Sequence, residues 1–117
     1  MKTAYFWLTP QGEQLALRLQ EAFGGTIEPK AAFDAAVRRD FAACDLLVFI
    51  MASGIAVRKI APLVQSKASD PAVLVLDQQG KYVISLLSGH LGGANAAARR
   101  LSLIHISEPT RHLRISY

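Results

Sequence analysis

The apolar run LLVFIM at residues 46–51 constrains the fold more than any other stretch of this chain. Six apolar residues in succession, with no polar residue between them, are typical of a central strand covered on both faces of a parallel sheet. The small residues at 52–54 follow the run, and a helical pattern begins near Ile55. A buried strand that leads directly into a helix predicts a βα unit of an α/β fold.

The rest of the chain repeats this alternation. Further strands are predicted at residues 4–9, 26–28, 73–77 and 82–87, and further helices at residues 10–23, 30–41 and 93–101. The link DQQGK between the last two strands is short and contains Gly80, which predicts that these strands pair as a hairpin. We therefore expect a Rossmann-like, three-layer α/β sandwich with a mostly parallel sheet and one antiparallel hairpin.

Composition excludes several classes of protein. The 117 residues are 51% apolar and 19% charged, which is typical of one globular domain. The net charge of +4 comes from scattered basic residues rather than a basic stripe, so we expect no nucleic-acid partner. One cysteine, Cys44, excludes a disulfide framework and favours a small buried side chain. No signal peptide and no apolar run near the roughly 18 residues of a membrane span is visible, so we expect a cytoplasmic protein.

The last residues differ from the rest. Residues 102–117, SLIHISEPTRHLRISY, have neither a helical period nor a clear strand, and they resemble translated sequencing-adapter sequence. We expect residues 1–101 to form the domain and residues 102–117 to be a non-native tail. The alternative is that LIHIS adds a short strand to the sheet.

A glycine-rich stretch follows the last predicted strand, and it reads SGHLGGAN at residues 88–95. Gly89, Gly92 and Gly93 lack a β-carbon, so a ligand can approach the backbone closely there. The N–H groups that begin the next helix have no partners within the helix and attract anions. The stretch does not match the G-x-G-x-x-G or Walker A nucleotide fingerprints, and the alternative role for these glycines is a tight turn.

Other candidate residues follow from the predicted sheet. If the strands at 4–9, 45–51 and 82–87 run parallel, then Ser53, Gly54 and the stretch 88–95 converge at the carboxyl edge, where open α/β sheets bind ligands. Arg58 lies one turn into the following helix and would supply positive charge there, or else face solvent. His90 can carry protons near neutral pH, or it can cap a helix.

Several motifs in one order resemble the amino-terminal domain of the CbiG family, the cobalt-precorrin-5A hydrolases of cobalamin biosynthesis. They are DLLVFIMAS, GIAVRKIAP, KASDPAV and DQQGKYVISLLSGHLGGAN. The resemblance is strong over residues 45–101 and loose over residues 1–44. It implies a hydrolase that opens a δ-lactone on a cobalt-bearing macrocycle and releases acetaldehyde. Cobalt would belong to the substrate, so no protein metal site or cofactor is expected.

The resemblance also implies residue roles. His90 is the candidate proton carrier, and the contacts expected for the carboxylates and the oxyanion are Ser53, Gly54, Arg58, Ser88, Gly89, Gly92, Gly93 and Asn95. Family members continue into a carboxyl-terminal domain that this sequence lacks, so we expect the fragment alone to be inactive. The alternative function is a non-catalytic module that binds a carboxylate- or phosphate-bearing ligand at the same edge.

Overall fold

A computed structural model of the chain describes residues 1–89, 96, 97, 99 and 101. The strands are β1 (Thr3–Trp7), β2 (Thr26–Ile27), β3 (Leu46–Ile50), β4 (Ala72–Leu76) and β5 (Val83–Ser88). The helices are α1 (Pro10–Phe23), α2 (Phe33–Ala43) and α3 (Ser53–Ile60), and 3₁₀ turns at Lys30–Ala32 and Ala61–Leu63 adjoin α2 and α3. Residues 96, 97, 99 and 101 are helical.

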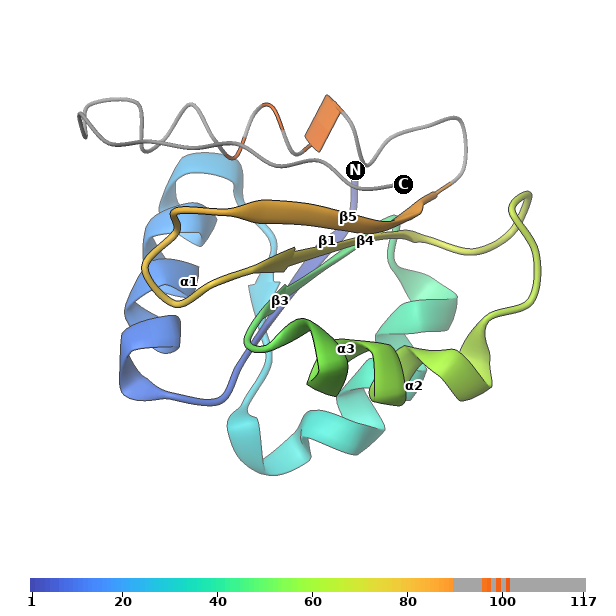
Figure 1. Cartoon of the computed structure of the whole chain (residues 1–117), viewed down its shortest axis with the longest axis horizontal. Coiled ribbons are helices and arrows are strands. Elements are labelled where there is room, and N and C mark those ends of the chain that lie inside the picture. The colour runs from blue at the N-terminus through green and yellow to red at the C-terminus, as the bar shows by residue number, and fades with distance from the viewer. Residues whose placement is uncertain (90–95, 98, 100, 102–117) are drawn as a thin grey trace.

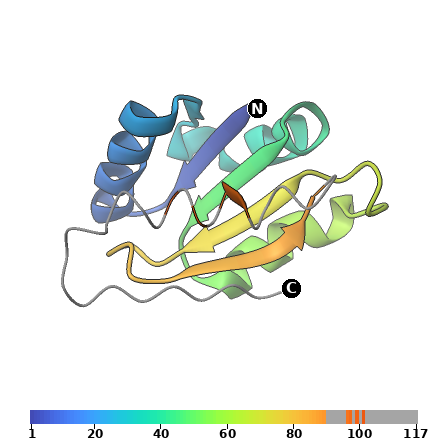
Figure 2. The ribbon, with the colours of Figure 1, turned by 90° about the horizontal axis from the view of Figure 1, so that it is seen from above.

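The strands form one five-stranded sheet in the order β2-β1-β3-β4-β5. The pairs β1–β2, β1–β3 and β3–β4 are parallel, and β5 pairs antiparallel with β4. Figure 2 shows the β5 arrow pointing opposite to those of β3 and β4, at the outer side of the sheet. The mostly parallel sheet with one antiparallel hairpin is therefore confirmed.

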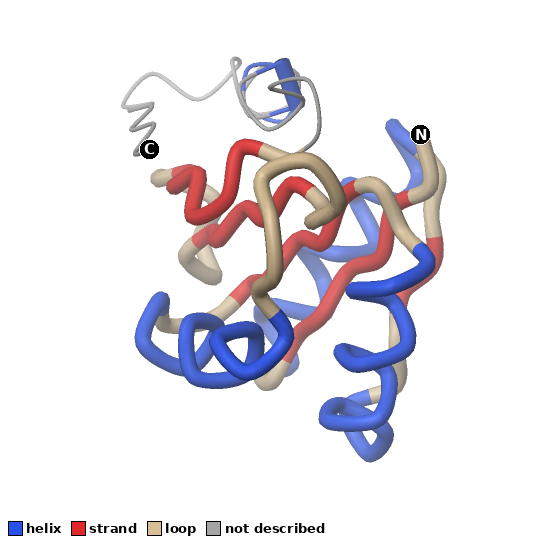
Figure 3. Tube along the Cα trace, turned by 90° about the vertical axis from the view of Figure 1, so that its right-hand side faces the viewer, coloured by secondary structure: helices blue, strands red, loops and turns tan. Residues whose placement is uncertain are grey.

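Helices cover both faces of the sheet and make the expected three layers. One apolar cluster joins α1, with Leu15 and Leu19, to alternate strand residues and to Ala97 and Leu101. A second cluster joins α2 and α3 to the other strand face, with Val37 and the neighbouring apolar residues. In Figures 1 and 3, α2 and α3 lie on one side of the strands and the described residues after β5 lie on the other.

β3 lies at the centre of the sheet and contributes to both clusters. All five of its residues are buried, because helices cover both faces of this strand. On the α2 side, the ring of Phe49 stacks on Phe6 with 4.8 Å between centroids. Phe33 of α2 meets the same two rings edge-on, with centroids 5.9 and 6.3 Å away. The apolar run of the sequence thus forms the buried centre that it predicts.

The first helix begins as its sequence predicts. Thr9 is extended and its hydroxyl oxygen accepts a hydrogen bond of 3.1 Å from the N–H of Gly12, so it caps α1, and Pro10 follows as the first helical residue. A β-carbon on Gly12 would lie 3.3 Å from a methyl carbon of Ile50. The glycine therefore lets the start of α1 pack tightly against the end of β3.

Two buried carboxyl groups share one arginine: Glu28 lies before α2, and Asp40 belongs to α2. Glu28 and Asp40 are 7% and 4% exposed, and Arg39 bonds both: its Nη2 lies 2.5 Å from Glu28 Oε2 and its Nε lies 3.0 Å from Asp40 Oδ1. Burial, and then the neighbouring Asp40, raise the pKa of Glu28, and Arg39 opposes that rise. The thiol of Cys44 also has a raised pKa, mainly because it is buried.

This arrangement predicts a pH-dependent stability difference for Glu28→Gln. Since the folded state binds the Glu28 proton more tightly than the unfolded state, its stabilising contribution is complete below pH 4.5 and is lost as pH rises through the raised pKa. We expect the unfolding free energy of the wild type minus that of Glu28→Gln to fall from pH 4 to pH 7 in urea titrations. Glu21→Gln, the same change at an exposed position, is the control. A difference that rises with pH would contradict the prediction.

Predicted and observed elements differ mainly at their ends. The second predicted helix, residues 30–41, is divided into a 3₁₀ turn and α2, which continues to Ala43. Within the predicted helix 93–101, the described residues 96, 97, 99 and 101 are helical, and the remainder lies outside the described residues. Residues 102–117 also lie outside them, so the division of the chain at residue 101 stays a prediction.

Candidate functional site

The carboxyl ends of β1, β3 and β4 lie along one edge of the sheet, because these strands are parallel. Ser53 and Gly54 are exposed at this edge, in the first turn of α3. No side chain caps that helix, since its N-cap is Ala52. The predicted position of Ser53 and Gly54 at the carboxyl edge is therefore confirmed, and their backbone is accessible to solvent.

The predicted convergence of Ser88 with Ser53 is wrong. Because β5 runs antiparallel to β4, Ser88 pairs with Ala72, the first residue of β4, rather than with Leu76, the last. The short turn at residues 77–82 reverses the chain, so the end of β5 returns to the edge where β4 begins. Ser88 and Gly89 therefore lie at the amino edge, a strand length of about 13 Å from the carboxyl edge.

The two basic residues of α3 differ in their surroundings. Lys59 Nζ lies 2.6 Å from Asp34 Oδ1 of α2 and 5.5 Å from the centroid of the Phe33 ring, so Lys59 of α3 contacts two residues of α2. The same lysine lowers the pKa of Asp34. Arg58 is exposed and has no ion pair within the described part of the chain. Arg58 is the sixth of the eight residues of α3, and the described linings of the pockets at the two edges do not include it.

A pocket of about 350 Å³ opens at the carboxyl edge beside Ser53. It lies between the end of β3 and the hairpin, and Asp77 and Tyr82 line its hairpin side. The carboxylate of Asp77 accepts hydrogen bonds from the N–H groups of Tyr82, at 2.8 Å, and Gln79, at 3.3 Å, and so holds the turn. Among the residues that the structure describes, the lining has the acidic Asp77 and no basic side chain, which is unfavourable for an anion.

A larger pocket of about 400 Å³ opens at the amino edge, between residues 64–70 and residues 86–89. Ser88 and Gly89 line one side, and Lys67 lines the other. The loop of residues 64–70 lies beside the carboxyl end of β5, at the right of Figure 1. The sequence analysis did not select Lys67, although it lies in the quoted motif KASDPAV; its place opposite β5 depends on the reversed direction of that strand.

Gly89 requires its glycine for two reasons. Its φ of +72° lies in the left-handed region that L side chains rarely adopt. A β-carbon here would lie 2.4 Å from the backbone nitrogen of Ala72, at a distance that real β-carbons do not show. The positive φ and the close approach to β4 give this position a structural need for glycine, and the two roles weighed for the glycine-rich stretch stay predictions.

Other candidate residues lie outside the described residues. They are His90, Gly92, Gly93 and Asn95, so their predicted roles stay predictions.

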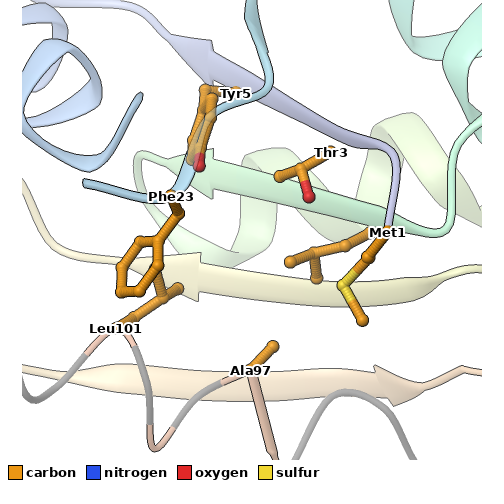
Figure 4. Close-up of a pocket in the computed structure, with 7 residues that line it drawn as sticks. Met1, Thr3, Tyr5, Phe23, Ala97 and Leu101 are labelled. Atoms are coloured by element: carbon orange, nitrogen blue, oxygen red, sulfur yellow. The ribbon is translucent and has the colours of Figure 1, made fainter. Parts of the chain in front are cut away.

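A third cavity lies on the α1 face of the sheet (Figure 4). Its volume is about 130 Å³, and Tyr5, Phe23 and Leu101 are among its lining residues. The hydroxyl of Tyr5 donates a 2.8 Å hydrogen bond to the carbonyl oxygen of Gly24. This cavity is a small gap in the packing between α1 and the described residues after β5, well below the usual volume of a ligand pocket.

Within the described residues, no group of three or more His, Cys, Asp or Glu side chains is arranged to hold a metal ion. Across the same residues, no helix combines the length and the apolar character needed to cross a membrane. Neither finding tests the expectation that the protein needs no cofactor.

The comparison that decides the family concerns residues 35–109, more than half of the chain. These residues match the profile described as "Cobalamin synthesis G N-terminal". The chain belongs to the cobalamin synthesis G family. The resemblance expected from the sequence motifs is therefore confirmed, and so is the family's role in cobalamin biosynthesis as its description states it.

Two curated relatives of this family carry the name cobalt-precorrin-5A hydrolase. The protein of Salmonella typhimurium is 47% identical over 111 residues, which cover 85% of this chain and 32% of the relative. The protein of Priestia megaterium is 50% identical over 56 residues, which cover 48% of this chain and 15% of the relative. Both names describe hydrolases, and the chain spans about a third or less of their length.

A crystal structure supports the fold. It is of a cobalamin biosynthesis protein G homologue from Sulfolobus solfataricus, with a TM-score of 0.75 and 25% identity. The likeness covers 99% of this chain and 36% of that one. The α/β sandwich is therefore an arrangement that this family of proteins adopts.

Proposed function

We propose that this chain forms the amino-terminal part of a cobalt-precorrin-5A hydrolase. The observation that carries the proposal is the 47% identity to the Salmonella typhimurium protein of that name across 85% of the chain. The family profile, which includes the glycine-rich stretch, supports it. The remaining two thirds of such relatives would complete the enzyme, and we expect the fragment alone to lack turnover.

The proposed reaction opens the δ-lactone of the corrinoid precursor and releases acetaldehyde. Water adds its oxygen to the acyl carbon, the acyl C–O bond breaks, and the released alkoxide takes up a proton. Loss of acetaldehyde then breaks a C–C bond: the hydroxyl loses its proton as its carbon becomes a carbonyl, and the electron pair stays on the macrocycle, which is protonated. Cobalt is part of the substrate throughout.

The proposed residue roles follow this chemistry. His90 is proposed to move the protons, because an imidazole titrates near neutral pH and both steps need a proton donor and acceptor. An oxyanion develops on the lactone carbonyl and needs hydrogen-bond donors placed beforehand. The donors proposed are the N–H groups of Gly92 and Gly93 and the side chains of Ser88 and Asn95.

We place the reaction at the amino edge, beside Ser88 and Gly89. Ser53 and Gly54 take no part in this proposal, because they lie at the carboxyl edge, about 13 Å away along the strands. Arg58 takes no part because it does not line the described part of the amino-edge pocket. The described lining of the pocket at the amino edge has one lysine and one aspartate, Lys67 and Asp70, whereas that of the pocket beside Ser53 has Asp77 and no lysine or arginine. A substrate with several carboxylates favours the pocket that offers a lysine.

The test is a His90→Ala change in a full-length chimaera. Residues 1–101 of this chain would replace the matched part of the Salmonella typhimurium protein, and acetaldehyde release and substrate binding would be measured separately. We expect kcat to fall on the order of 100-fold with the dissociation constant within about threefold, as for a lost proton carrier.

Other outcomes would change the proposal. A weaker dissociation constant that accounts for the whole loss would make His90 a binding residue and would favour the non-catalytic module. An unchanged kcat would overturn the role of His90. A folded chimaera that releases no acetaldehyde, beside an active Salmonella parent, would overturn the proposed function.

A further inference from the structure

One wall of the pocket at the amino edge is a hydrogen-bonded loop that carries Lys67 and the buried carboxylate of Asp70. Asp70 is 7% exposed, and its carboxylate accepts hydrogen bonds from the N–H groups of Gln65, at 2.9 and 3.2 Å, and Ser66, at 3.1 Å. The hydroxyl oxygen of Ser66 also accepts a 3.0 Å bond from the N–H of Ala68. Lys67 therefore projects from a loop held at both sides, while the one carboxylate in the lining is already bonded to the backbone.

The opposite wall is apolar because β5 contains a bulge. The pairing register shifts between Val73 and Leu74, so Val73 pairs with Leu87 and Leu74 pairs with Ser85. In a regular strand, Leu86 and Leu87 would point to opposite faces. The extra residue lets both leucines pack against the cluster on the α2–α3 face, and both line the pocket.

A third apolar residue completes this surface. Val64 lines the same pocket from the loop side and is 45% exposed. Val64, Leu86 and Leu87 together form the apolar floor of the pocket. Lys67 and the hydroxyl groups of Ser66 and Ser88 add polar groups to the same lining. Lys67 has no ion pair within the residues that the structure describes. Such a lining suits a ligand that is apolar on its face and anionic at its margin.

We infer that this pocket binds the edge of a cobalt corrinoid, with the ring margin against Val64, Leu86 and Leu87 and a peripheral carboxylate against Lys67. The inference rests on the proposed function for the class of ligand and adds the binding surface. Lys67 supplies charge, and the apolar floor removes ring surface from water. A hydrolysable lactone bound here would lie beside Ser88 and Gly89, where the glycine-rich stretch begins.

Binding to the 117-residue chain tests this assignment without turnover. The two probes are dicyanocobyrinic acid, which carries free carboxylates, and dicyanocobinamide, in which amides replace all of these carboxylates on the same ring. We expect Lys67→Glu to weaken binding of the acid at least tenfold and to change cobinamide binding less than threefold. Lys81→Glu is the matched control: it makes the same charge change in the hairpin turn at the opposite edge, and it should change neither affinity more than twofold.

A second variant tests the apolar floor. Val64→Gln, at a half-exposed position that folding tolerates, should weaken both probes about equally, by threefold or more. The pocket assignment is overturned if the wild type binds neither probe, if Lys67→Glu and Lys81→Glu weaken the acid equally, or if Val64→Gln changes nothing.

The two proposals can fail separately. Lys67→Glu in the active chimaera should raise KM for the substrate at least tenfold and change kcat less than threefold. An unchanged KM in an active chimaera would overturn the pocket and leave the hydrolase function in place. Selective binding of the acid by the wild-type chain, beside an inactive wild-type chimaera, would support the pocket and overturn the function.

Discussion

Phe49→Ala should remove about 3–5 kcal/mol of unfolding free energy, as deletion of a buried aromatic ring does. Phe49 is 0% exposed in the central strand, stacks on Phe6 and meets Phe33 edge-on, so its loss leaves a cavity at the join of β1, β3 and α2. Domains of this size have about 5–15 kcal/mol in total. Urea unfolding followed by circular dichroism measures the change.

Two controls accompany this variant. Leu17→Ala deletes a large apolar side chain that is 45% exposed on α1, and it should change stability by less than about 0.5 kcal/mol. Phe49→Leu keeps much of the apolar volume and should lose less than Phe49→Ala. Equal losses for Leu17→Ala and Phe49→Ala would show that β3 is not the centre of the core.

Gly89→Ala is expected to cost about 2–4 kcal/mol, the sum of left-handed backbone strain and overpacking against Ala72. The new β-carbon would meet the nitrogen, Cα and Cβ of Ala72 at 2.4–2.7 Å, and the backbone of β4 cannot give way without breaking its pairing with β5. The change also displaces the chain that leads to His90. We expect both a lower urea midpoint and, in the chimaera, weaker corrinoid binding.

Two other glycines separate the causes of this loss. Gly24 has a φ of +76° and a ψ of −168°, with nothing within 4 Å of an added β-carbon, so Gly24→Ala should cost about 1–3 kcal/mol of backbone strain alone, less than Gly89→Ala. Gly54 is helical and equally open, so Gly54→Ala should leave stability unchanged or raise it by up to about 1 kcal/mol. If Gly89→Ala costs no more than Gly24→Ala, the close approach to Ala72 is not present in solution.

The position of Ser88 affects how the family's motifs are interpreted. GIAVRKIAP begins at the carboxyl edge of the sheet, whereas KASDPAV and the segment SLLSG meet at the amino edge. Open parallel sheets usually bind ligands at the carboxyl edge. Here the antiparallel strand brings Ser88 and Gly89, the start of the glycine-rich stretch, to the other edge, and Lys67 and Ser88 come together there, although they lie 21 residues apart in the sequence.

Much of the fold could be predicted because its signals are local. The apolar run at 46–51 predicts a buried central strand, and Thr9 before Pro10 predicts the start of α1; the structure confirms both. The turn containing Gly80 predicts the hairpin, which is also observed. The predicted start of the second helix is less accurate, because Ala31 and Ala32 suit an α-helix and a 3₁₀ turn alike.

The sequence by itself determined the layers of this protein, since hydrophobic periodicity states which face of each helix and strand must leave water. It also carried the motifs that identify the family. The predicted hairpin at Gly80 already implies that β5 runs antiparallel to β4 and that Ser88 returns to the amino edge, so the predicted convergence of Ser88 with Ser53 conflicts with this signal of the sequence. Only the tertiary structure decided that Lys67 lies opposite Leu86 and Leu87, because that placement depends on the path of the loop that Asp70 holds.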